Sequence, residues 1–83
     1  PPAIQPSDIN SLEAKIYAVI DRFKEYLPID NERYRLGYNF YKTLSGEGDS
    51  ALVTIKKNKL TLKGISEKEL AEKIEEELKI IQS

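Results

Sequence analysis

The sequence predicts an α+β domain with the element order α-β-β-β-α: a three-stranded antiparallel meander with two helices packed on one face. Two observations support this prediction. From Tyr34 to Lys63, apolar and polar residues alternate, which is the period of a half-buried strand. In the flanking segments, apolar residues instead recur at intervals of three and four, which is the period of an amphipathic helix. Two such helices can cover one face of the sheet.

The chain of 83 residues is expected to form one domain behind a short lead-in. Residues 1–8 include Pro1, Pro2 and Pro6 and should be extended, and residues 9–83 form the domain. Because the chain contains no Met, we expect a domain of a larger protein. No basic segment precedes an apolar one, as it would in a signal peptide, so an intracellular location is favoured over secretion.

Each predicted helix begins at a capping box. Asn10 is the predicted N-cap of the first helix, with Glu13 three residues later, and Pro28 is predicted to end that helix. Ser66 and Glu69 form the same motif before the second helix. The apolar stripes that should face the sheet are Leu12, Ile16, Val19, Ile20, Phe23 and Leu27 in the first helix, and Leu70, Ala71, Ile74, Leu78 and Ile81 in the second.

Three strands are predicted between the helices, over residues 34–44, 50–57 and 59–63. Residues 45–49 contain two glycines and should form a hairpin loop. Asn58 is the predicted turn between the last two strands, because Asn adopts positive φ more readily than most residues. The side chains predicted to face the core are Tyr34, Leu36, Tyr38 and Phe40, then Ala51, Val53 and Ile55, then Leu60 and Leu62.

Positive charge is concentrated in the middle of the chain. The net charge is −1, yet residues 32–63 carry seven basic and three acidic side chains, and both flanking segments are acidic. Alternation would collect much of this charge on the sheet face that the helices leave open, where an acidic protein partner could bind. A face selected only for solubility and strand propensity is the alternative. The candidate binding residues on this face are Arg35, Tyr41, Lys56, Lys59 and Lys63.

The residue types present exclude most kinds of catalytic and metal site. The chain has no His and no Cys, so it lacks histidine general bases, cysteine nucleophiles and thiolate zinc ligands. The glutamates near the C-terminus lie on the solvated side of the last predicted helix, with lysines four residues away, where they stabilise the helix. We therefore expect no enzyme, cofactor or metal site, but a non-catalytic protein-protein interaction or assembly module of a larger soluble protein.

Two further side chains lie outside the apolar stripes of their helices. Tyr17 and Ile80 are predicted to be exposed. Single exposed apolar residues are common, but two on the same side of a small domain would form a partner surface or a homo-oligomer interface.

Gly64-Ile65-Ser66-Glu67-Lys68 resembles the turn into the final helix of the double-stranded-RNA-binding domain, whose element order matches the predicted one. This resemblance implies RNA binding as the alternative function. The family carries a lysine cluster in the first turn of that helix, whereas here Glu67, Glu69 and Glu72 surround Lys68 and would repel phosphate. The resemblance therefore implies a degenerate member used for protein contacts.

Overall fold

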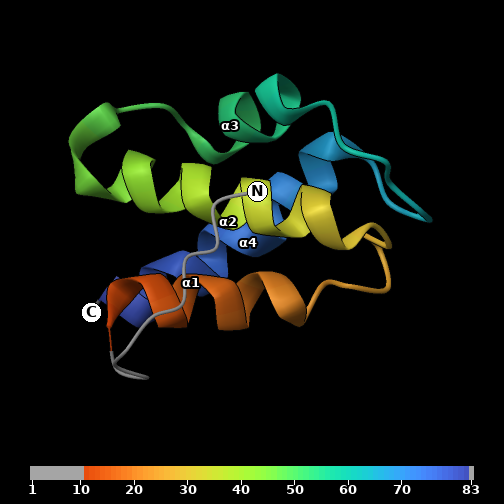
Figure 1. Cartoon of the computed structure of the whole chain (residues 1–83). Coiled ribbons are helices and arrows are strands. Elements are labelled where there is room, and N and C mark those ends of the chain that lie inside the picture. The colour runs from red at the N-terminus through yellow and green to blue at the C-terminus, as the bar shows by residue number, and fades with distance from the viewer. Residues whose placement is uncertain (1–10, 83) are drawn as a thin grey trace.

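A computed structural model describes residues 11–82, except for the side chain of Glu47. Within these residues the fold is all-helical, so the predicted α+β fold with its three-stranded antiparallel sheet is wrong (Figure 1). The predicted lead-in, residues 1–8, lies outside the described residues, as does the predicted cap Asn10. The elements are α1 (Leu12–Asp21), α2 (Asp30–Lys42), the π-helical turn η1 (Thr43–Glu47), α3 (Ala51–Asn58) and α4 (Glu67–Gln82).

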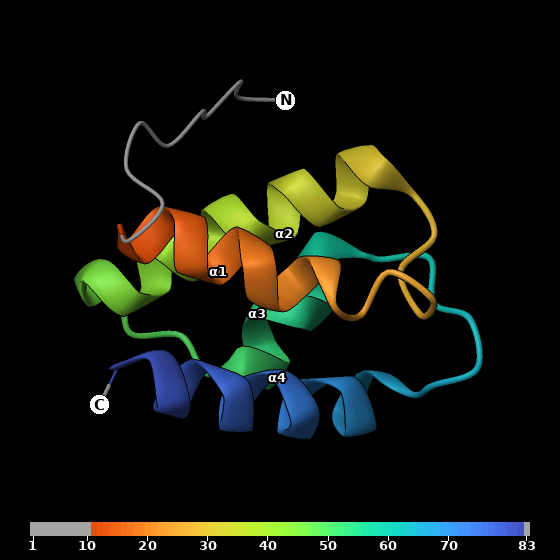
Figure 2. The ribbon, with the colours of Figure 1, turned by 90° about the horizontal axis from the view of Figure 1, so that it is seen from below.

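The four helices pack in a ring around one core. Helices α1 and α3 each pack against both α2 and α4, so that α1 and α3 lie on opposite sides of the domain (Figures 1 and 2). All four helices contribute buried side chains to the core, and Leu27, between α1 and α2, adds another. The buried core residues are Ile16, Ile20, Leu27, Leu36, Phe40, Ala51, Ile55, Leu70, Ala71, Ile74 and Leu78.

The first predicted helix is present as α1, with different ends. Ser11 is its N-cap, and the Oγ of Ser11 accepts a hydrogen bond from the backbone N–H of Ala14 at 3.1 Å. The helix ends at Asp21, well before Pro28, and residues 22–26 form a series of turns after it. The predicted stripe is nevertheless buried or partly buried along its whole length.

The last predicted helix is present as α4. The Oγ of Ser66 accepts a hydrogen bond from the backbone N–H of Glu69 at 3.1 Å, as the capping box predicts. Its predicted stripe faces the core, and Ile80 is exposed.

Helix α2 forms where the first strand was predicted. Leu36 and Phe40 are buried one helical turn apart, and Gly37 is buried beside them, whereas Tyr34 is 52% exposed. Both periods fit this segment because apolar residues also occur at every second position from Tyr34 to Phe40. Acidic residues in the first turn and a lysine in the last turn complement the helix dipole and favour the helix.

Helix α3 forms where the second strand was predicted. The Oγ of Ser50 caps it by accepting a hydrogen bond from the backbone N–H of Val53 at 3.2 Å. The run of β-branched residues 53–55 favoured a strand, but burial follows helical spacing instead. The buried residues of α3 are Ala51, Thr54, Ile55 and Asn58.

Residues 59–63, the third predicted strand, form no ladder within the described part of the chain. The predicted alternation is present, since Leu60 and Leu62 pack against the core and the residues between and beside them are exposed. Their backbone groups bond elsewhere. The backbone N–H and Oγ1 of Thr61 donate to the carboxylate of Glu32, at 2.7 and 3.1 Å, so this segment is fixed to α2 without a sheet.

The turns of the chain depend on backbone in the left-handed region. Gly46, within η1, and Gly48, directly after it, lie in the predicted loop and have φ of 117° and 86°. The positive φ that was predicted at Asn58 occurs instead at Lys59, with φ of 50°. Asn58 is the last residue of α3 and is buried.

Helices α1 and α2 approach each other closely at Gly37. The ring of Tyr17 lies against this glycine, and a Cβ atom added there would be 2.6 Å from Cε1 of Tyr17. The ring of Tyr17 also meets that of Tyr34 edge-on, with centroids 6.2 Å apart. A residue without a side chain at position 37 therefore allows the tyrosine ring to fit between the two helices.

Candidate interaction surface

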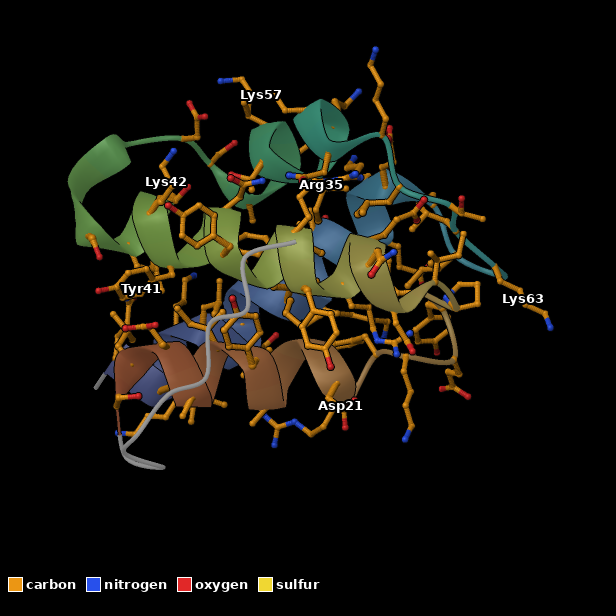
Figure 3. The ribbon with its side chains drawn as sticks, in the orientation of Figure 1. Asp21, Arg35, Tyr41, Lys42, Lys57 and Lys63 are labelled. Atoms are coloured by element: carbon orange, nitrogen blue, oxygen red, sulfur yellow. The ribbon has the colours of Figure 1, made fainter. Side chains whose placement is uncertain are left out.

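Five exposed cationic side chains belong to α2, to α3 or to the residue that follows α3. We call this group the basic face; all of its members are exposed. Figure 3 shows Arg35 and Lys42 on α2 beside Lys57 on α3, with Asp21 on the distant helix α1. The members of the basic face are Arg35, Lys42, Lys56, Lys57 and Lys59.

Asn58 is the centre of a hydrogen-bond network that joins α2 to α3. The Oδ1 of Asn58 accepts hydrogen bonds from Nε of Arg35 at 3.1 Å and from Nδ2 of Asn39 at 2.9 Å. Its own Nδ2 donates to the backbone carbonyl of Thr54 at 2.7 Å. With its side-chain oxygen and nitrogen both bonded, Asn58 can be 93% buried at little cost, and it fixes the guanidinium of Arg35 on the surface.

A polar hollow of about 270 Å³ opens between α2 and α3 beside this network. On its wall, Nζ of Lys57 lies 2.8 Å from Oδ2 of Asp49. The Nζ of Lys42 lies 5.7 Å from the ring centroid of Tyr38 and forms no ion pair with any described side chain. Besides Asn58, the hollow is lined by Asn39, Lys42, Thr43, Asp49, Thr54 and Lys57.

The predicted binding residues do not share one surface. Arg35, Lys56 and Lys59 belong to the basic face, although no sheet exists to place them there within the described residues. Tyr41 is partly buried and packs against the core. Lys63 lies in the segment before α4, at one end of the domain (Figure 3).

Lys42 and Lys57 were not among the predicted binding residues, because neither is in register with the residues of the predicted open sheet face. Helical spacing contains the signal that places Lys42 correctly. Arg35 and Lys42 are seven residues apart, close to two helical turns, and therefore lie on the same side of α2.

The two predicted interface residues differ in exposure. Ile80 is 63% exposed on α4, whereas Tyr17 packs between α1 and α2 with its hydroxyl group buried. That hydroxyl has no hydrogen-bond partner among the described residues. Burial raises the pKa of Tyr17 above its ordinary value of 10.0, and the charge of Glu13 and the neighbouring Tyr38 raise it further.

Tyr17→Phe is expected to increase the free energy of unfolding by about 1 kcal/mol at neutral pH, because it removes a buried hydroxyl without a partner. The raised pKa means that Tyr17 ionises at lower pH in the unfolded chain than in the folded one. The free energy that this pKa difference adds to folding is fully present at pH values below the pKa of Tyr17 in the unfolded chain. It is lost as the pH rises through the pKa of Tyr17 in the folded protein. Urea unfolding at pH 7 and above pH 10 should therefore show a smaller alkaline loss in Tyr17→Phe; an equal loss would contradict the assignment.

Other kinds of site receive no support from the described residues. They contain no group of three or more His, Cys, Asp or Glu side chains that could hold a metal ion. None of the helices in residues 11–82 is both long and apolar enough to cross a membrane. The element order that carried the resemblance to the double-stranded-RNA-binding domain is not the observed order. Comparisons with family models, curated proteins and solved structures found no match.

Proposed function

We propose that this chain is a non-catalytic protein-protein interaction module that binds an acidic segment of its partner through the basic face. The observation that carries the proposal is the grouping of exposed cations on α2 and α3 with a single ion pair among them. Arg35, Lys42, Lys56 and Lys59 form no ion pair with any described side chain, and within the basic face only Lys57 does, with Asp49. Exposed like charges repel one another and are relieved by a complementary partner.

Helix α3 adds an apolar contact to this face. Val53 is 39% exposed and lies one helical turn before Lys56 and Lys57, on the same side of α3. An apolar residue bordered by charges is the usual arrangement of a small protein interface, in which burial supplies affinity and charge supplies orientation and association rate.

The charge distribution favours a protein partner over a nucleic acid. Next to α3, helix α4 carries six glutamates and three lysines, and the whole chain has a net charge of −1. A phosphate backbone extends over many charges and would meet these glutamates, whereas a short acidic segment of a protein can be confined to the basic face.

Charge reversal at Lys56 and Lys59 tests the proposal. We expect Lys56→Glu/Lys59→Glu to weaken binding to a partner captured from nuclease-treated lysate by about tenfold or more, since two attractions become repulsions. The matched control is Lys15→Glu/Lys24→Glu, which changes the net charge equally at exposed positions on and just after α1, on the side opposite α3.

The control should retain the partner with nearly unchanged affinity, and thermal unfolding should verify that both variants are folded. Equal losses in both variants would show that only net charge matters. Loss of all capture after nuclease treatment would identify a nucleic acid as the ligand, and the proposal would be wrong.

A further inference from the structure

We propose that the polar hollow between α2 and α3 is a socket for a single anionic group of the partner, a carboxylate or a phosphate monoester, held between Lys42 and Lys57. This inference rests on the proposed function and names the group that the basic face recognises. Figure 3 shows both lysines on the side of the domain where α2 and α3 meet.

The side chains that line the hollow carry one more positive charge than negative charge. Asp49 neutralises Lys57 across 2.8 Å, which leaves the charge of Lys42 uncompensated. The ring of Tyr38, 5.7 Å away, supports the ammonium group of Lys42 by a cation–π contact without neutralising it. One bound anion would restore charge balance in the hollow.

Hydrogen-bonding capacity around the hollow points to an anion rather than a cation. The Oδ1 of Asn58 already accepts two hydrogen bonds. The Oγ1 of Thr54 donates its only proton to the carbonyl of Ser50 at 3.0 Å. Donors remain in excess, because the three N–H groups of Lys42, two of Lys57 and one on Nδ2 of Asn39 are not used by the bonds described above.

The dimensions and rigidity of the hollow suit a single anionic side chain of a protein partner. A volume of about 270 Å³ is below the range of roughly 300–1,000 Å³ typical of sites for drug-sized ligands. Thr54 and Asn58 are 3% and 7% exposed, and their hydrogen bonds hold the wall before any ligand arrives. Binding one carboxylate or phosphate group therefore requires little reorganisation.

Titration of the 15N-labelled full chain with three capped amino acids tests the socket. The probes are N-acetyl-glutamate methylamide, N-acetyl-phosphoserine methylamide and the neutral N-acetyl-glutamine methylamide, at constant ionic strength. We expect the anionic probes to cause saturable shifts at the amides of Asn39, Thr43, Thr54 and Asn58, and the neutral probe to cause none. The tighter of the two anionic probes identifies the group.

Substitutions of Lys42 and Asp49 should change the affinity for the anionic probes in opposite directions. Lys42→Gln is expected to weaken binding of the anionic probes at least about fivefold, because it removes a charge-assisted donor. Asp49→Asn is expected to strengthen binding by about threefold, because it removes an anion that competes for Lys57. Lys24→Gln, an exposed charge loss just after α1, is the matched control and should have little effect.

The proposal of a socket would be wrong if the amide shifts do not saturate, if the glutamine probe binds equally well, or if Lys24→Gln and Lys42→Gln weaken binding equally. These outcomes leave the proposed function to be judged separately by the charge reversal at Lys56 and Lys59, neither of which lines the hollow.

Discussion

Phe40→Ala is expected to reduce the free energy of unfolding by about 3–5 kcal/mol, the cost of removing a large side chain from a packed core. Phe40 is 1% exposed and belongs to the core cluster formed by all four helices. Native domains have roughly 0.05–0.15 kcal/mol of stability per residue, so for a chain of 83 residues this loss is a large part of the total. Urea unfolding followed by circular dichroism at 222 nm measures this loss.

Tyr34→Ala is the matched control, because it also removes an aromatic ring from α2. Tyr34 is 52% exposed and its ring meets that of Tyr17 edge-on, so the loss should be about 1 kcal/mol or less. A strand would bury Tyr34 and Phe40 on the same face, and the two substitutions would then cost similar amounts. Equal losses would therefore contradict the helical fold.

Gly37→Ala is expected to destabilise the protein by about 2 kcal/mol, although alanine is the better helix former by about 1 kcal/mol. The added Cβ would lie 2.6 Å from Cε1 of Tyr17, which is inside van der Waals contact. The ring cannot easily move aside, because its hydroxyl is buried and its edge packs against Tyr34. Thermal and urea unfolding of the single variant measure the loss.

A double-mutant cycle with Tyr17→Ala separates the steric effect from helix propensity. Without the tyrosine ring, alanine at position 37 should become stabilising, because only its higher helix propensity remains. Destabilisation by Gly37→Ala in both backgrounds would show that the close approach of α1 and α2 at Gly37 is not the cause.

The two terminal helices were predictable because separate signals agree in each. The capping serine at position 66 and the apolar stripe from Leu70 to Ile81 identify the same helix, and no other period fits that segment. The N-terminal end of α1 was predicted less exactly, since adjacent residues Asn10 and Ser11 are both good caps.

The middle of the chain was not predictable from local pattern, because its residues satisfy two periods at once. Tyr34 and Tyr38 are apolar enough to complete an alternating strand, yet they flank the helical pair Leu36 and Phe40. In α3 a run of β-branched residues favours a strand by propensity. The burial of Ile55 in the core, where α3 packs against α2 and α4, outweighs that preference. This packing cannot be predicted from the neighbouring residues in the sequence.

The candidate site was predictable only in part. The concentration of positive charge between residues 32 and 63 is visible in the sequence, and it contains all members of the basic face. Their grouping depends on the packing of α2 against α3, and the hollow depends on Asn58, a residue that sequence analysis assigned to a turn. A helical period applied to Arg35 would have placed Lys42 on the same side of the helix.

The ring of helices also has a consequence for how the chain folds. Helices α1 and α2, α2 and α3, and α3 and α4 are pairs of neighbours along the sequence, and among the described helices only α1 and α4 pack across a long separation. Such a topology has low contact order, which is typical of domains that fold in microseconds to milliseconds. The α1–α4 contact carries the largest loop-closure entropy. Packing of α2, α3 and α4 can therefore assemble the basic face before α1 closes the ring.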